Sequence, residues 1–101
     1  MKKISAAFVM AMLATGMAYG AGDAAAGKAK AAMCAGCHGA AGVSINPMWP
    51  NLAGQKEAYL SKQIIAFRDG TRTDAVMGPM AASLSDDDAA NLAAYFAGLS
   101  Q

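Results

Sequence analysis

The chain has 101 residues, of which 8 are basic and 7 acidic, together with 2 cysteines and 1 histidine. This length accommodates one domain at most. The sequence contains no basic patch of the kind that binds nucleic acid and no polybasic segment of the kind that binds lipid headgroups.

Residues 1–20 have the layout of a secretory signal peptide. Two lysines form a short basic start, an apolar stretch follows, and small residues lie near its end. The apolar stretch is shorter than the roughly 20 residues that a membrane-spanning helix needs, so we expect cleavage after Gly20 rather than an uncleaved anchor. Residues 21–101 are then the mature domain. Two of the 8 basic residues are lost, so 6 remain against 7 acidic ones, a formal net charge of −1.

The first predicted helix of the mature domain is the alanine-rich segment 21–33, for which Asp23 is the expected N-cap. Gly27 lies inside this helix, where glycine costs roughly 0.5–1 kcal/mol relative to alanine. A second helix that crosses closely at this point would explain the glycine. The next segment, 39–54, is rich in glycine and proline and is predicted to be a loop. Its apolar side chains need an apolar surface to pack against.

Residues 56–69 carry apolar side chains at helical spacing, which predicts a second helix. Gly70 is the expected stop at its C-terminal end. Residues 71–83 form a second predicted loop, in which Met77 and Met80 flank a Gly-Pro pair.

Residues 85–99 carry the clearest helix signals in the sequence. Ser85 and Asp88 are spaced for a capping box, and the aspartates of the first turn lie where the helix dipole favours negative charge. Signals for strands are scarce, so the predicted fold is all-α, with three main helices and two apolar loops. A chain of roughly 80 residues rarely gains more than about 3–5 kcal/mol from one hydrophobic core. Long apolar loops in so small a domain therefore favour a non-protein group in its interior.

Both cysteines and the only histidine lie in one short stretch, MCAGCHG at residues 33–39. The pattern C-x-x-C-H is the attachment signature of c-type haem. On a helical turn, Cys34 and Cys37 point to one side and can add to the two vinyl groups of a porphyrin, which places the imidazole of His38 under the iron. Attachment requires reduced cysteines outside the cytoplasm, in agreement with the export signal. We therefore expect one covalent haem c, which would also fill the interior.

Two other kinds of cysteine site fit the sequence less well. A thioredoxin-like redox pair belongs to a fold with βαβ units, for which the strand signals are missing. A structural zinc ion needs about four ligands, whereas Cys34, Cys37 and His38 supply three and the chain has no other cysteine or histidine. An incidental disulfide between the two cysteines stays open as an alternative.

The sixth ligand of the iron is expected to be a methionine, because the chain has no second histidine and a thioether ligand favours the ferrous state. Met33 adjoins the motif, and Met48 lies ten residues beyond His38, so both belong to the histidine side. Met77 and Met80 lie beyond the second helix, where the chain can return over the opposite face. One of these two is the expected ligand.

The mature sequence resembles the class I c-type cytochromes, of the short soluble monohaem type found in bacteria, and is similar to one half of the bacterial dihaem cytochromes. Three segments carry the resemblance: GDAAAGKAKAAMCAGCHGAAG, PNLAGQKEAYLSKQIIAFRDGTRT and LSDDDAANLAAYFAGL. The resemblance implies the class I cytochrome c fold and the function of an electron carrier. The sequence has no second haem motif, so the two-haem arrangement does not apply to it.

The resemblance also implies roles for single residues. Leu84 precedes the last helix at the spacing from the axial methionine that the family uses, which favours Met77, with Met80 second. Pro47 is implied as the residue whose carbonyl accepts a hydrogen bond from the axial imidazole, with Pro50 second. Such a bond fixes the orientation of the ring and makes the imidazole a more basic ligand.

Two further sets of contacts follow from the resemblance. The first and last helices are expected to cross at Gly27, against Tyr95 or Phe96. Three side chains are implied as hydrogen-bond partners of the haem propionates: Trp49, Tyr59 and Arg68.

The function expected from these features is that of a periplasmic carrier that passes single electrons between redox proteins, without catalysis and without a small-molecule substrate. Its partners are expected to dock transiently at an apolar rim near Met48, Trp49 and Met77. The mature protein is expected to be a monomer without stable membrane insertion. Three alternatives stay open: an electron-transfer subunit of a larger dehydrogenase or oxidase, a five-coordinate gas-binding or peroxidatic haem protein, and a thiol–disulfide protein.

Overall fold

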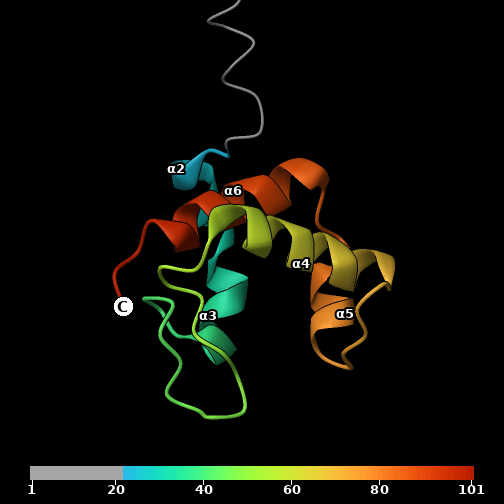
Figure 1. Cartoon of the computed structure of the whole chain (residues 1–101), viewed down its shortest axis with the longest axis horizontal. Coiled ribbons are helices and arrows are strands. Elements are labelled where there is room, and N and C mark those ends of the chain that lie inside the picture. Colours follow the sequence, from blue (N-terminus) through green and yellow to red (C-terminus); the bar gives the residue numbers. More distant parts are fainter. Residues whose placement is uncertain (1–21) are drawn as a thin grey trace, which may run out of the picture.

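The computed structural model describes residues 22–101, and every regular element in this part of the chain is a helix (Figure 1). The all-α prediction is therefore confirmed. The predicted signal peptide, residues 1–20, lies outside the described residues. In chain order the helices are α2 (Ala24–Lys30), α3 (Ala32–His38), α4 (Glu57–Asp69), α5 (Met77–Ala81) and α6 (Asp86–Ala97).

The helix predicted over residues 21–33 is divided in two. Asp23 is its N-cap, as expected, and the carboxylate accepts backbone N–H bonds from Ala25 and Ala26. The first part, α2, ends at its C-cap Ala31, and α3 begins directly afterwards. The interruption separates the helix that packs on α6 from the helix that carries the C-x-x-C-H motif.

Helices α2 and α4 both pack against α6, which is therefore the central element of the fold (Figure 1). The predicted capping box is present at its start: Ser85 accepts the N–H of Asp88, and Asp88 accepts the N–H of Ser85. The side chains of Leu92 and Phe96 lie one turn apart and are buried. The predicted helix over residues 85–99 is thus confirmed, with its last turn shortened.

The prediction that residues 71–83 form a loop throughout is wrong, because this segment contains the five-residue helix α5. Asp74 starts the turn, since its backbone carbonyl accepts the N–H of Gly78 at 3.0 Å. Pro79 lies in the first turns of this short helix, where the missing N–H of proline is tolerated. The Gly-Pro pair therefore does not prevent a helix here.

The hydrophobic core of the described chain is thin. Five of its nine buried hydrophobic residues are alanines. The larger buried side chains are Leu60, Leu84, Leu92 and Phe96. Leu52, Ile64 and Phe67 pack against this core but are only partly buried. Some large apolar side chains in the interior are thus not fully covered by protein, which agrees with the expectation of a non-protein group there.

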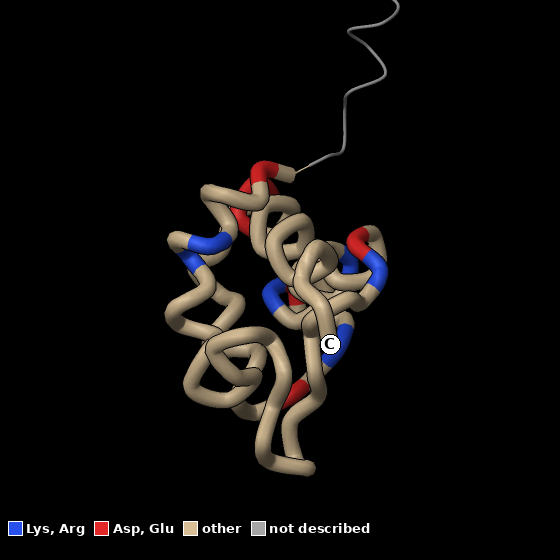
Figure 2. Tube along the Cα trace, turned by 90° about the vertical axis from the view of Figure 1, so that its left-hand side faces the viewer, with Lys and Arg blue, Asp and Glu red and all other residues tan. Residues whose placement is uncertain are grey.

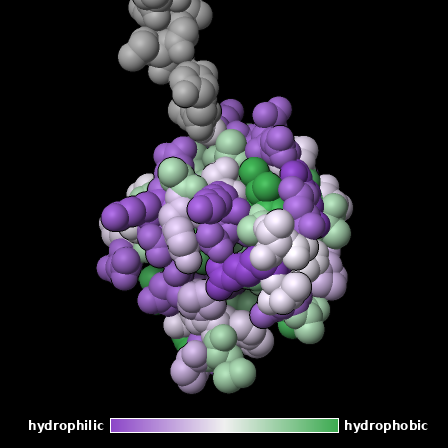
Figure 3. All heavy atoms as spheres, turned by 45° about the vertical axis from the view of Figure 1, so that its right-hand side comes forward, coloured by the Kyte–Doolittle hydropathy of each residue, from purple (hydrophilic) through white to green (hydrophobic). Residues whose placement is uncertain are grey.

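The surface is mixed. Hydrophilic residues cover most of the face shown in Figure 3, with small apolar patches between them. The loop that follows α3 carries no charged residue from Gly39 to Gln55, and the acidic and basic residues lie on other parts of the chain (Figure 2). Among residues 22–101 no helix has the length and hydropathy to span a membrane.

Candidate functional site

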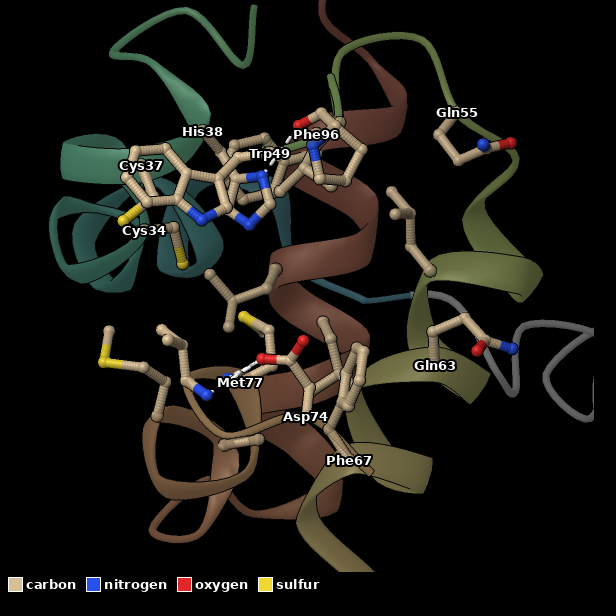
Figure 4. Close-up of a pocket in the computed structure, with 18 of the residues that line it drawn as sticks. Cys34, Cys37, His38, Trp49, Gln55, Gln63, Phe67, Asp74, Met77 and Phe96 are labelled. Carbon is tan, nitrogen blue, oxygen red and sulfur yellow. Dashed lines mark hydrogen bonds between the residues drawn. The ribbon is translucent and has the colours of Figure 1, made fainter. Parts of the chain in front are cut away.

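Helix α3 directs Cys34, Cys37 and His38 into one cavity of about 420 Å³. The cavity lies between α3 with its following loop on one side and α4, α5 and α6 on the others (Figure 4). Both cysteines are free thiols and are partly buried. The spacing C-x-x-C-H therefore does bring the three side chains to one surface, as the sequence predicted.

The imidazole of His38 is buried and held by one hydrogen bond. Its Nδ1 atom lies 2.8 Å from the carbonyl oxygen of Pro50 (Figure 4). A carbonyl oxygen can only accept, so Nδ1 carries the proton and donates it. In the neutral imidazole this leaves the other ring nitrogen, Nε2, with its lone pair, which is the form that binds a metal.

The prediction that Pro47 supplies this carbonyl is wrong. The backbone N–H of Trp49 donates to the carbonyl of Asn46 at 3.1 Å, which closes a turn with Pro47 at its second position. Proline is favoured at that position because its fixed φ suits the turn. The chain returns to α3 only after the turn, where Pro50 meets His38. Pro50, the second choice from the sequence, is therefore the residue that supplies the carbonyl.

The loop end that carries Pro50 is tied back to the rest of the fold. The carbonyl of Gly42 accepts the N–H groups of both Leu52 and Ala53, at 2.8 and 3.0 Å. The N–H of Gly54 donates to the carbonyl of Phe96 in α6 at 3.0 Å. These bonds set the position of Pro50, and through it the orientation of the imidazole.

Helix α5 lines the side of the cavity opposite His38 (Figure 4). Met77 and Met80 are both partly buried and both line the cavity. Asp74 also lines it, and its carboxylate accepts the backbone N–H groups of Met77 and Val76, each at 2.9 Å. These two hydrogen bonds hold the pKa of Asp74 below its ordinary value.

The polar side chains at the cavity come mainly from α4 and the segment beyond it. Arg72 donates to Gln63 at 2.7 Å, and its guanidinium lies 4.5 Å from the ring centre of Phe67. This is a cation–π contact. Trp49 and Tyr59, two of the three side chains implied as propionate contacts, also line the cavity.

Arg68, the third implied propionate contact, is not among the residues that line the cavity. Its guanidinium donates to Asp86 at 2.7 Å and to Asp69 at 2.8 Å. A third bond reaches the carbonyl of Leu84. Arg68 therefore joins the end of α4 to the start of α6, and its contact with a haem propionate stays a prediction. Arg72 is the arginine that the fold brings to the cavity.

Burial raises the pKa of the Cys34 thiol above its ordinary value. A thiol that attacks disulfides needs the opposite, since the thiolate is the reactive form and its formation is favoured by a lowered pKa. The environment of Cys34 thus argues against the thiol–disulfide alternative.

A family model for cytochrome c matches residues 24–100 of the chain. The chain belongs to the cytochrome c family. The matched region includes the whole C-x-x-C-H motif, so haem c is the cofactor of this chain.

Individual cytochromes agree with this assignment. The chain is 50% identical over 97 residues to cytochrome c4 of Pseudomonas aeruginosa, covering 96% of this chain and 48% of that protein. It is 51% identical over 79 residues to cytochrome c-554(548) of Halomonas halodenitrificans, covering 75% of this chain and 95% of that protein. The chain therefore spans about half the length of the first cytochrome and matches nearly all of the second.

A solved cytochrome has the same fold. The crystal structure of reduced recombinant cytochrome c4 from Pseudomonas stutzeri matches with a TM-score of 0.71 and 34% sequence identity. The match covers 79% of this chain and 52% of that chain. The prediction of a class I cytochrome c fold, similar to one half of a dihaem cytochrome, is confirmed.

The cavity fits a haem on three observations. Its volume lies in the range of cofactor sites. The partly buried side chains of Leu52, Ile64 and Phe67 line it, so a flat apolar group would complete the thin core. The two free thiols of α3 and the Nε2 atom of His38 are the groups that would attach and ligate haem c.

Sequence reasoning missed several residues that line the site of this cytochrome, namely Asn51, Gln55, Gln63, Arg72 and Asp74. Asp74 had a usable local signal, because an aspartate side chain commonly accepts backbone N–H groups two or three residues further along the chain. The Gly-Pro pair in the same segment favoured a loop instead. The polar side chains of α4 and its flanks carried no comparable signal.

Proposed function

We propose that the mature chain is a periplasmic electron carrier with one haem c, bonded through thioethers to Cys34 and Cys37. When bound, the haem iron supplies a one-electron couple between the ferric and ferrous states. The observation that carries the proposal is the pairing of His38 with a methionine-bearing helix across one apolar cavity (Figure 4). Such an arrangement suits six-coordinate iron, which exchanges electrons without binding a substrate.

His38 is the proposed axial ligand on the α3 side. Its Nδ1–H bond to Pro50 fixes the ring and increases the basicity of Nε2. Met77 is the proposed ligand on the other side, with Met80 as the second choice. A thioether in this position favours the ferrous state and thereby raises the reduction potential.

The exposed apolar side chains beside the cavity are the proposed docking surface for redox partners. Met48 is 80% exposed, Val76 50% and Trp49 37%, and all three line the cavity. Because the loop from Gly39 to Gln55 carries no charge, association is expected to depend only modestly on salt. Partners are expected to form small, transient interfaces.

Export is part of the same proposal. Residues 1–20 are proposed to be a signal peptide, and the mature domain is proposed to begin at residue 21. The layout of basic, apolar and small residues supports this. Haem attachment requires a compartment outside the cytoplasm, and this requirement also supports export.

The decisive experiment uses the protein exported and matured in a bacterial periplasm. Mass spectrometry should give the mass of residues 21–101 plus one haem. Optical spectra should show the reduced α-band of covalent haem and, in the ferric protein, the weak absorption at the near-infrared edge that marks Met–Fe(III) ligation. A high-spin spectrum with ready binding of carbon monoxide by the reduced protein would instead identify a five-coordinate haem protein. A mass without haem would contradict the proposal altogether.

A further inference from the structure

The carboxylate of Asp74 caps the segment that carries Met77. One oxygen, Oδ1, accepts the backbone N–H of Val76 and that of Met77, each at 2.9 Å. The carbonyl of Asp74 accepts the N–H of Gly78 at 3.0 Å. Asp74 therefore has the bonding pattern of an N-cap for the turn that leads into α5, with Val76 and Met77 as the second and third residues after it. The residue directly before α5 is Val76, which makes no capping bond with its side chain.

The connection between α4 and α5 depends strongly on this cap. Residues 71–76 are all exposed, so little packing holds them in place. The last anchor to α4 is the bond from the N–H of Arg72 to the carbonyl of Ala66, at 3.1 Å. On the far side of Met77, the next anchor is Ala81, which is fully buried. Between these anchors, the backbone N–H of Met77 is bound by the side chain of Asp74.

The position of the backbone of Met77 decides where its side chain points. Figure 4 shows Met77 and Asp74 together on the side of the cavity opposite His38. Because α5 has only five residues, few hydrogen bonds of its own hold its first residue, Met77, in place. Loss of the bonds to Asp74 would leave the thioether free to move away from the cavity.

We propose that Asp74 is a positioning residue, whose side-chain oxygen holds the backbone of Met77 so that the thioether faces the haem site. The proposal rests on the proposed function, in which Met77 binds the iron. What Asp74 supplies is a hydrogen-bond acceptor, and the oxygen of asparagine supplies one too. Asp74→Asn should therefore preserve the position of Met77, whereas Asp74→Ala should release it.

The test uses the ferric, haem-loaded protein and free imidazole, which competes with the thioether for the iron. Imidazole binding is measured optically, well below the melting temperature, by the loss of the near-infrared absorption. Since loss of an N-cap corresponds to roughly a fivefold change in a local opening equilibrium, Asp74→Ala should bind imidazole about fivefold more tightly than the wild-type protein. Asp74→Asn should lie within about twofold of the wild-type affinity.

Asp23→Ala is the matched control, because Asp23 caps α2 through the same kind of bonds, at 3.0 and 3.3 Å. Asp23 is not among the residues that line the cavity. Its loss should lower the melting temperature and leave imidazole affinity unchanged. An equal increase in imidazole affinity in Asp23→Ala and Asp74→Ala would show that Asp74 stabilises the fold only in a general way, and would overturn the proposal.

Two other outcomes separate this inference from the ligand assignment. Near-infrared absorption that survives Met77→Ala overturns Met77 as ligand, and the role of Asp74 with it. Absorption that is lost in Met77→Ala, together with wild-type imidazole affinity in Asp74→Ala, overturns the role of Asp74 alone.

Discussion

Gly27 in α2 lies directly against the backbone of Asn91 in α6, so that a Cβ atom on Gly27 would collide with the Asn91 carbonyl oxygen and crowd the Cβ of Tyr95. This contact lies where α2 packs on α6. The crossing of the first and last helices at Gly27 against Tyr95 is therefore confirmed, and the main obstacle is backbone rather than an aromatic ring.

Gly27→Ala should destabilise the haem-loaded protein by about 2–3 kcal/mol, towards the upper end of the cost of overpacking. A backbone carbonyl cannot move aside by changing a rotamer, so the two helices would have to separate. Denaturant unfolding measures the effect. Gly36→Ala is the control, because a Cβ at that position meets nothing within 4 Å. It should be neutral or stabilising by up to about 1 kcal/mol.

Met77→Ala should abolish the weak near-infrared absorption of the ferric protein and lower the reduction potential, because the ferrous state loses its thioether ligand. Met80→Ala should retain the absorption, since Met80 is expected only to pack beside the haem. Optical spectra and a redox titration of both variants provide the measurement. The reverse pattern would assign the ligand to Met80.

Pro50→Ala should disturb the haem site more than Pro47→Ala. Both variants keep their carbonyl groups, but only the position of the Pro50 carbonyl orients His38. In NMR spectra of the reduced wild-type protein, the Nδ1 proton of His38 should exchange slowly with water, and Pro50→Ala should accelerate this exchange. A larger effect of Pro47→Ala would contradict the hydrogen bond described above.

Arg72→Gln should lower the reduction potential at low ionic strength. Arg72 lines the cavity, and a positive charge there disfavours the ferric state, which carries the additional positive charge. Arg68→Gln should leave the potential nearly unchanged and lower the melting temperature, because Arg68 links α4 to Asp86 at the start of α6. A redox titration that shows the larger shift for Arg68→Gln would favour the contact implied by the family resemblance.

Acid should weaken the fold partly through Asp88. The backbone N–H of Ser85 and the ammonium group of Lys30 hold the pKa of Asp88 below its ordinary value of 3.8. Because the folded pKa is the lower one, the unfolded chain takes up this proton first as the pH falls. The contribution of Asp88 is therefore complete well above pH 3.8 and is lost as the pH falls through the folded pKa.

Asp88→Asn removes this titration and keeps a hydrogen-bond acceptor. Its free energy of unfolding should consequently depend less on pH than that of the wild-type protein, in the range below about pH 4. Asp87→Asn, in the same turn but outside the capping box, is the control. Identical pH profiles for Asp88→Asn and the wild-type protein would show that the capping carboxylate does not contribute.

Local chemistry predicted most of the helices. Asp23 is an N-cap, Ser85 and Asp88 form a capping box, and Gly70 is a left-handed C-cap. Each of these signals depends on residues within one turn. The break at Ala31 was not predicted, because the alanines on both sides favour a continuous helix. In the fold, α2 packs against α6 and α3 does not.

At the site, by contrast, the outcome depends on residues far apart in the sequence. The choice between Pro47 and Pro50 depends on how the turn after Asn46 directs the chain back to His38. The direction of Arg68 depends on the position of Asp86, which belongs to another helix. Neither relationship can be predicted from the spacing of residues along the sequence.

The sequence by itself determined the haem attachment motif, the all-helical class and the helix caps, because these depend on residues that are adjacent or one turn apart. Only the tertiary structure decided which carbonyl holds the imidazole, which arginine reaches the cavity and which acidic side chain supports Met77. Those outcomes depend on where separate helices and loops come to lie once they pack around a shared interior.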